Sequence, residues 1–142
     1  MDDLHIGSAS AADLDSVLDF WKSAAEGTSI SDDLAGIGRL HARDPHALLL
    51  ARRGGGALVG TVIAGFDGWR CHLYRLAVHP GHRRQGIGTA LLAAAEERFE
   101  ALGGRRADAM VLDRNARAHG AWRAAGYGPE EHWTRWVKPL AH

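Results

Sequence analysis

The first third of the chain has apolar residues at helical spacing. Positions i, i+3, i+4 and i+7 of one predicted helix form an apolar stripe that consists of Leu14, Val17, Leu18 and Trp21. We expect Trp21 to lie in the core because it belongs to this stripe. A second, shorter helix is predicted over residues 34–40, and the hydroxyl of Ser31 is expected to cap its N-terminus.

The pattern then changes to one typical of strands. Apolar runs at residues 47–51 and 58–66 flank the turn-prone sequence RRGGGA, so they are predicted to form an antiparallel hairpin. A third strand is predicted over residues 70–78, after a turn at Asp67-Gly68. Because strand side chains alternate, Cys71 should point away from a face shared by His72, Tyr74, Leu76 and Val78.

The second half of the chain alternates between helices and short strands. Residues 87–102 predict a long helix that stops at Gly103, because the run is rich in Ala, Leu and Glu. A short strand is predicted over 107–112, a fourth helix over 116–127, and a final edge strand over 133–140. Strands in runs with helices inserted between them indicate an α/β fold, in which helices cover a mixed sheet.

Composition and charge limit the possible functions. The 142 residues, of which 46% are hydrophobic, have the size and composition of a single domain spanning 1–142. Because 17 Lys and Arg residues balance 17 Asp and Glu residues, we expect no nucleic acid and no membrane as a partner. The single Cys71 cannot form an internal disulfide. The N-terminal sequence lacks the features of a signal peptide, so we expect a cytoplasmic protein.

The segment HPGHRRQGIG, between the third strand and the long helix, has the features of an anion-binding loop. Backbone N–H groups at the start of a helix have no intrahelical acceptor and lie at the positive end of the helix dipole. Gly86 and Gly88 leave these groups open, while Arg83 and Arg84 add positive charge. The expected ligand is a pyrophosphate. No lysine follows either glycine, which excludes a P-loop, and the GxGxxG pattern of a dinucleotide fold is absent.

Two motifs resemble those of the GNAT superfamily of acyl-coenzyme A-dependent N-acyltransferases. The sequence YRLAVHP followed by R-x-x-G-x-G is similar to motif A, and N-x-x-A…W-x-x-x-G-Y, which starts at Asn115, is similar to motif B. The likeness spans residues 58–127. It implies a GNAT fold, with a central mixed, mostly antiparallel sheet splayed at the fourth and fifth strands and flanked by about four helices.

The resemblance also implies a binding site for acetyl-CoA as cosubstrate. The backbone of residues 76–78 would pair with the pantetheine arm, residues 84–89 would hold the pyrophosphate, and Asn115 would lie beside the pantetheine. The implied coenzyme-binding residues are Leu76, Ala77, Val78, Arg83, Arg84, Gln85, Gly86, Ile87, Gly88, Thr89, Asn115 and Trp122. No metal is expected, because the histidines lack the spacing of metal ligands.

The candidate catalytic residues depart from the usual pattern of the family. Trp122 stands where many members have a tyrosine as general acid, and Met110 stands where peptide N-terminal acetyltransferases commonly carry a glutamate. Counting back from motif A, His72 occupies the place of the glutamate base of histone-modifying relatives. A neutral imidazole can accept the proton of an ammonium group, and Tyr74 would orient the substrate. A purely structural strand histidine is the alternative.

We therefore expect an N-acetyltransferase that moves acetyl from acetyl-CoA to a primary amine by direct attack in a ternary complex. The acceptor would be a small molecule or a protein or peptide amine, and the sequence does not identify it. The alternative is a non-catalytic acyl-CoA-binding or sensing module, which the missing tyrosine leaves open. Trp133 and Trp136, near the C-terminus, would suit the surface of a homodimer, because edge strands and aromatic residues favour such contacts.

Overall fold

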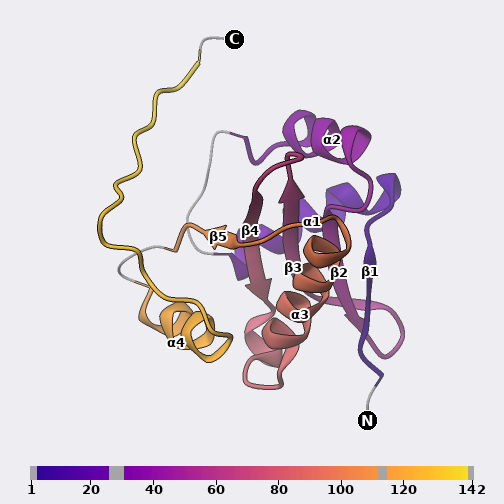
Figure 1. The fold of residues 1–142 in the computed structure, drawn as a ribbon. Coiled ribbons are helices and arrows are strands. Elements are labelled where there is room, and N and C mark those ends of the chain that lie inside the picture. Colours follow the sequence, from indigo (N-terminus) through magenta and orange to yellow (C-terminus); the bar gives the residue numbers. More distant parts are fainter. Residues whose placement is uncertain (1–2, 26–30, 112–114, 141–142) are drawn as a thin grey trace.

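A computed structural model describes residues 3–25, 31–111 and 115–140, which form one five-stranded sheet with helices on both faces (Figure 1). The strands are β1 (His5–Ser8), β2 (Leu48–Arg53), β3 (Ala57–Phe66), β4 (Cys71–Val78) and β5 (Ala107–Ala109). The helices are α1 (Leu14–Ala24), α2 (Leu34–Arg43), α3 (Ile87–Ala101) and α4 (Ala116–Ala124), with the short 3-10 helices η1 (Ala11–Asp13) and η2 (Pro80–His82).

The strands lie in chain order across the sheet. The first four pair antiparallel with their neighbours, and β4 pairs with β5 in parallel. The β2–β3 hairpin turns through Gly54 and Gly56, whose φ values of +54° and +102° favour glycine. The parallel pair requires a crossover connection, which α3 provides. This arrangement confirms the predicted mixed, mostly antiparallel sheet.

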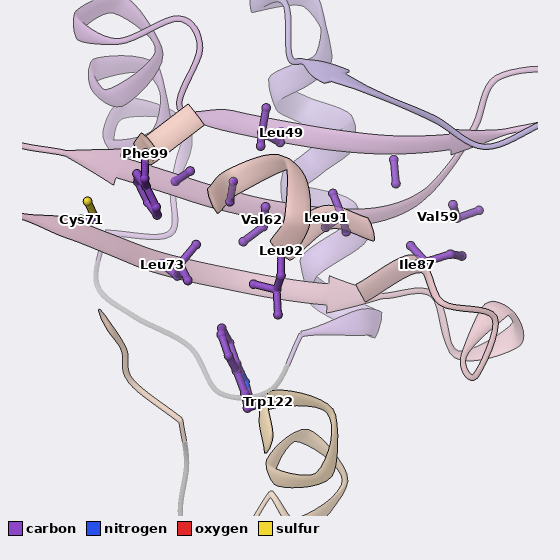
Figure 2. Close-up of a cluster of buried hydrophobic side chains, with 13 residues drawn as sticks. Leu49, Val59, Val62, Cys71, Leu73, Ile87, Leu91, Leu92, Phe99 and Trp122 are labelled. Atoms are coloured by element: carbon purple, nitrogen blue, oxygen red, sulfur yellow. The ribbon is translucent and has the colours of Figure 1, made fainter. Parts of the chain in front are cut away.

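Two apolar clusters cover the two faces of the sheet. On one face, α3 and Trp122 of α4 pack on the strands together with Leu73 and Phe99 (Figure 2). On the other face, α1 and α2 cover residues that include Leu48 and Leu50. Since both faces are covered, β2 and β3 have nearly continuous apolar sequences instead of alternating ones.

Helix α3 packs closely on β3 at Gly60. A Cβ atom on Gly60 would come within 2.9 Å of both Ile87 Cγ2 and Leu91 Cδ1. Ile87 is 1% exposed, which anchors the first turn of the helix in the core. The close contact fixes the start of α3 beside the end of β4, where the sequence predicts an anion-binding loop.

The sheet opens between β4 and β5. Their parallel pairing covers only Cys71–Leu73 of β4 and Ala107–Ala109 of β5. Within the described parts of the chain, the remaining β4 residues, 74–78, have β3 as their only neighbouring strand. The predicted splay at the fourth and fifth strands is therefore present, and one side of the β4 backbone faces away from the sheet.

A β-bulge interrupts β4 at Arg75 and Leu76. The register shifts between Thr61 and Ile63 of β3, so that β4 has one more residue than β3 over this stretch. Arg75 accommodates the extra residue with a left-handed φ of +53°. The bulge divides β4 into a part that continues beside β5 and a part that does not.

The bulge makes the predicted shared face of four β4 side chains wrong. His72 and Tyr74 do lie opposite to Cys71, as predicted. Leu76 and Val78 instead pack against the α3-side cluster that contains Cys71. One extra residue reverses the alternation of all the side chains that follow it.

The C-terminal elements are shorter than predicted. The strand predicted over 133–140 is absent, because these residues have no strand pairing in the structure (Figure 1). Trp133 and Trp136 are 75% and 91% exposed, so the described part of the chain gives them little packing that would support a strand. Strand β5 covers only the first half of the predicted run 107–112, and residue 112 lies outside the described residues.

The N-terminal elements agree better with the predictions. Trp21 is 7% exposed and belongs to the core, as predicted. The cap of α2 is Asp33 and not Ser31, because Asp33 Oδ1 accepts the N–H of Gly36 at 2.8 Å. Strand β1 was not predicted, because its four residues are too few to show a clear alternation.

Candidate functional site

The loop between β4 and α3 presents open backbone N–H groups. The first intrahelical bond of α3 runs from the N–H of Ala90 to the carbonyl of Gly86 at 3.0 Å. The N–H groups of residues 87–89 precede this bond and have no intrahelical acceptor. Arg84 and Gly86 adopt left-handed φ values of +65° and +80°, which turn the loop into the helix. This arrangement fits an anion, because the N–H groups lie at the positive end of the helix dipole.

Gly88 has no requirement for glycine within the fold. It lies inside α3, and a Cβ atom there would meet only Val78 Cγ2, at an ordinary contact distance of 3.8 Å. Gly86 differs, because its φ of +80° is unfavourable for residues with a Cβ atom. The fold therefore tolerates a Cβ atom at Gly88, between the start of α3 and the end of β4, and a glycine there is what close approach of a pyrophosphate would require.

Some polar side chains of the loop contact the rest of the fold, and others are exposed to solvent. Arg83 Nη2 donates to the carbonyl of Ala24 at 3.5 Å, which ties the loop to the C-terminal end of α1. Ile87 is buried, so that only its backbone can contribute to binding. The predicted coenzyme-binding residues of this loop with exposed side chains are Arg84, Gln85 and Thr89.

The last residues of β4 direct backbone groups to the open side of the sheet. The N–H of His79 donates to the carbonyl of Val59 at 2.8 Å, and Ala77 is also paired with β3. Successive residues of a strand direct their N–H groups to opposite sides, so the N–H of Val78 points away from β3. Strand β5 has already ended on that side. Leu76 and Val78 thus offer backbone where a pantetheine arm is expected to pair.

His72 lies between two carboxylates at the other end of β4. Its Nδ1 is 2.8 Å from Asp108 Oδ1, and its Nε2 is 3.4 Å from Asp67 Oδ2. The hydrogen bond with Asp108 raises the pKa of His72 above its ordinary value of 6.5; partial burial opposes this shift, and Asp67 adds to it. Because both ring nitrogens face carboxylate oxygens, the arrangement favours the imidazolium, which can donate to both.

A turn and a parallel strand supply the two carboxylates. Asp67 Oδ1 accepts the N–H groups of Arg70 at 2.7 Å and Trp69 at 2.8 Å, which closes the β3–β4 turn and lowers the pKa of Asp67. Asp108 lies directly opposite His72 in the β4–β5 register. The cluster therefore forms where the two strands are still paired, before the splay begins.

Tyr74 lies near the same cluster. Its side chain is 50% exposed, and its ring centroid is 6.2 Å from that of His72. Desolvation, together with the charges of Asp108 and Asp67, raises the pKa of the Tyr74 phenol. The hydroxyl therefore stays protonated near neutral pH and can donate a hydrogen bond. The structure thus brings the two predicted catalytic residues together.

The motif B residues contribute to the packing of α4. Asn115 caps the helix, because its Oδ1 accepts the N–H of Ala118 at 3.1 Å. Trp122 is 9% exposed and packs edge-on against Tyr127, with ring centroids 5.1 Å apart. Helix α4 ends at Ala124, before the predicted end at residue 127. The expected contacts of Asn115 and Trp122 with the coenzyme stay predictions.

Asp108 is a site residue that the sequence did not predict. A signal for it exists, because an aspartate within the apolar run at 107–112 is unfavourable in a strand and needs a specific reason. Thr61, in the apolar run of β3, gives no such signal, because threonine is favourable in strands. No local pattern indicates the bulge at Arg75.

Cys71 is buried on the α3 face, and desolvation raises the pKa of its thiol. A thiol in this state is a poor nucleophile. Over residues 3–25, 31–111 and 115–140, no three His, Cys, Asp or Glu side chains are grouped so that they could hold a metal ion. Over the same ranges, no helix combines the length and the apolar character needed to cross a membrane.

The chain is similar in sequence to known acetyltransferases. The model of the Acetyltransferase (GNAT) family matches residues 13–127. An acetyltransferase of Yersinia enterocolitica is 30% identical over 120 residues, which are 84% of each chain. An acetyltransferase of Pectobacterium atrosepticum is 31% identical over 115 residues, which are 81% of each chain.

Solved structures of acetyltransferases share the fold. AAC(6')-Iy in complex with a bisubstrate analog has a TM-score of 0.78 at 19% identity, and the match covers 98% of this chain and 100% of that chain. Ard1 from Thermoplasma volcanium has a TM-score of 0.76 at 22% identity, with coverage of 88% and 82%. These likenesses confirm the fold that motifs A and B predict.

Proposed function

The chain belongs to the GNAT family of acetyltransferases and is an acetyl-CoA-dependent acetyltransferase, and from this premise we propose that it acetylates a primary amine by direct attack in a ternary complex. One observation carries the proposal: β4 has open backbone at one end and a histidine between two carboxylates at the other. The first end would hold the acyl donor, and the second would accept a proton from the amine. Cys71 is buried, so a direct transfer fits better than one through a cysteine.

The open end has the groups that acetyl-CoA requires. When bound, acetyl-CoA supplies an activated acyl thioester and a thiolate leaving group. The space at Gly88 and the N–H groups of the first turn of α3 would hold the pyrophosphate, with added charge from Arg84. The backbone of Leu76 and Val78 would pair with the pantetheine arm. N–H groups on this side would stabilise negative charge that develops on a carbonyl oxygen.

His72 is the proposed proton acceptor. In this role the Nδ1–H group of His72 would donate a hydrogen bond to Asp108, which would fix the tautomer and leave Nε2 as the basic atom. A raised pKa makes the neutral imidazole a stronger base and moves its titration to higher pH. Asp108 and Asp67 then stabilise the imidazolium that forms. Tyr74 would orient the amine beside it.

A small cationic amine is the proposed class of acceptor. Asp67 and Asp108 place negative charge around His72, and Tyr74 offers aromatic surface with an exposure of 50%. Carboxylates and aromatic faces both attract ammonium groups. One structural neighbour is named an aminoglycoside antibiotic 6'-N-acetyltransferase, which supports this class of acceptor. A peptide or protein amine is the competing acceptor.

Acyl-CoA binding without acyl transfer is the outcome that would contradict this proposal. Trp122 stands in place of the usual acid and is buried in the core, so transfer has to be tested directly. The test incubates purified protein with acetyl-CoA and a panel of polyamines, aminoglycosides and peptides, and measures thiol release together with product mass. We expect amine-dependent thiol release and an acetylated small amine. Acetyl-CoA binding without release for any amine would contradict acetylation of a primary amine.

The C-terminal segment 133–140 supports a proposed homodimer. Its apolar side chains are 72% to 91% exposed, namely Trp133, Trp136, Val137 and Leu140. A concentrated set of exposed apolar side chains is typical of an interaction surface. We expect sedimentation to give a dimer for the wild type and a monomer after Trp133→Ser and Trp136→Ser are combined. A monomeric wild type would contradict this proposal.

A further inference from the structure

We propose that Thr61 is a positioning residue for acyl transfer: its buried hydroxyl, held by the Trp21 indole, fixes the bulge of β4 and the direction of the Leu76 N–H. The inference rests on the proposed function of the open side of β4. Thr61 itself lies on β3 in the core, so its influence would act through the bulge.

The bulge residue has a conformation that needs support. Arg75 has a φ of +53°, in the left-handed region that is unfavourable for a residue with a Cβ atom. It lies between Tyr74, at the His72 end of β4, and the open end that begins at Leu76. A change in the conformation of Arg75 would therefore change how the open end is oriented relative to His72.

Two hydrogen bonds in series end on this residue. The indole N–H of Trp21 donates to Thr61 Oγ1 at 2.9 Å, and the Thr61 hydroxyl donates to the Arg75 carbonyl at 2.9 Å. The direction is fixed by chemistry, because an indole N–H can only donate and the hydroxyl proton then remains for the carbonyl. Thr61 is 0% exposed, so water does not compete for either bond.

The peptide between Arg75 and Leu76 links this contact to the open side. A trans peptide is planar, and its C=O and N–H point in opposite directions. When the Thr61 hydroxyl holds the Arg75 carbonyl, it also sets the direction of the Leu76 N–H, which points away from Thr61. This N–H belongs to the backbone that would contact the acyl donor in the proposed function.

The side chain of Arg75 is held by the same layer of the fold. Its guanidinium forms an ion pair with Asp32, which precedes α2, and its Cζ atom lies 5.7 Å from the centroid of the Trp21 ring. Trp21 therefore supports Arg75 at both its carbonyl, through Thr61, and its guanidinium. The bulge is tied to α1 and to the segment before α2.

Packing alone does not call for a hydroxyl at this position. Valine has nearly the shape of threonine, and the neighbouring β3 residues Val59, Val62 and Ile63 are apolar. A buried hydroxyl is favourable only when its partners are in place. Its partners here meet where β4 changes register, which is why we assign Thr61 to the geometry of the bulge.

The test compares Thr61→Val, which removes the hydroxyl and keeps the shape, with Thr61→Ser, which keeps the hydroxyl. Leu48→Val controls for lost packing, because Leu48 is buried in the apolar cluster between the sheet and helices α1 and α2. Outright removal of one oxyanion donor typically lowers kcat about 10²–10³-fold. Thr61→Val would only displace the Leu76 N–H, so kcat should fall roughly 10- to 100-fold. The acceptor KM and coenzyme A affinity should change little. The rate of hydrogen exchange at the Leu76 amide should differ from the wild-type rate in Thr61→Val and should match it in Thr61→Ser.

A kcat for Thr61→Val no lower than that of Leu48→Val, or a Leu76 amide that exchanges as in the wild type, would overturn the proposal. If Thr61→Val does not fold, Trp21→Phe decides, because it removes the support of the hydroxyl. In Trp21→Phe, a partial loss of kcat together with an altered exchange rate of the Leu76 amide would support the proposal. Wild-type values of kcat and of this exchange rate would overturn it. The amide measurement needs no substrate, so it tests Thr61 even if the wild type transfers no acetyl group.

Discussion

The two ends of β4 contribute to the proposed reaction with different kinds of atoms. At the end that pairs with β5, the side chain of His72 lies between Asp67 and Asp108. Beyond the bulge, the side chains of Leu76 and Val78 turn into the core, and the backbone faces the open side. Side-chain identity therefore specifies one end, and the conformation of the chain specifies the other.

This difference indicates which substitutions should affect which step. Changing an ionisable group at the His72 end should alter the pH dependence of turnover and leave coenzyme A binding unchanged. Adding volume beside the open end should weaken coenzyme A binding and leave the pH dependence unchanged. A substitution that alters both properties equally would contradict this division of roles between the two ends of β4.

The largest effect is expected for His72→Ala. Loss of a general base typically lowers the rate about 10²–10⁴-fold, so kcat/KM should fall by that factor and lose its acidic limb. In the wild type this limb should lie above pH 6.5, because the hydrogen bond with Asp108 raises the pKa of His72. The measurement is kcat/KM as a function of pH, with coenzyme A affinity as the control.

The matched variant His72→Glu should retain part of the activity. Its acidic limb should move to lower pH, because a carboxylate is a weaker base than an imidazole. Should His72→Ala keep a near wild-type rate and the same pH profile, His72 would be a structural residue and another group would accept the proton.

The next largest effect is expected at the open end, for Gly88→Val. The added side chain would occupy the space beside the helix start, and coenzyme A affinity should fall at least about tenfold, roughly 1.4 kcal/mol. Gly38→Val is the control, because Gly38 also lies in a helix and a Cβ atom there meets nothing within 4 Å. Calorimetry measures both variants. Equal affinity of a folded Gly88→Val protein and the wild type would make the loop only a helix start.

A smaller effect is expected for Asp108→Asn, which tests how far Asp108 raises the pKa of His72. Without this carboxylate the pKa of His72 should fall, so the acidic limb of kcat/KM should move to lower pH. Asp67→Asn should cause a smaller shift, because its contact with His72 is 3.4 Å long against 2.8 Å for Asp108. NMR titration of the imidazole measures both shifts. An unchanged pKa in Asp108→Asn would remove the physical basis of the cluster.

The contact between His72 and Asp108 also predicts how the free energy of unfolding depends on pH. The pKa of His72 is raised in the folded state, so its contact with Asp108 stabilises the fold fully below the unfolded pKa of about 6.5. This contribution is lost as pH rises through the folded pKa. The difference in unfolding free energy between the wild type and Asp108→Asn should therefore shrink as pH rises, as urea denaturation can measure. A difference that grows with pH would contradict the assignment.

The smallest effect is expected for Trp122→Phe, at a residue that belongs to neither end. Trp122 is buried in the α3-side cluster, so the variant should keep kcat within roughly threefold, or about 0.7 kcal/mol. Trp122→Tyr should raise turnover if a phenol there protonates the leaving thiolate. Steady-state kinetics compares the two variants. A Phe variant that folds and binds acetyl-CoA without turnover would give the indole a direct catalytic role.

The open end of β4 is the more predictable of the two ends. A strand, an arginine- and glycine-containing loop and a helix follow one another locally, and residues 83–89 form the predicted loop and helix start. The His72 cluster is only partly predictable. Asp108 lies 36 residues away in sequence and meets His72 through parallel register, which local patterns do not encode.

The errors of sequence analysis have physical causes. The predicted face of Leu76 and Val78 is wrong because one bulged residue reverses the alternation, and an arginine at position 75 does not indicate a left-handed φ. The run 133–140 has the residue types of a strand but no paired edge in the structure. Strand propensity reflects packing against neighbours, so a strand without a neighbour does not form.

An NMR titration tests whether coenzyme A binds at the open end of β4 while His72 accepts the proton at the other end. Isotope-labelled protein is titrated with coenzyme A while the backbone amides and the His72 imidazole are observed. We predict the largest shift changes at residues 76–78 and 84–89, small changes at Cys71–Leu73, and an unchanged pKa of His72. The largest changes at Cys71–Leu73, or a His72 pKa that moves as far as in Asp108→Asn, would contradict the division of β4.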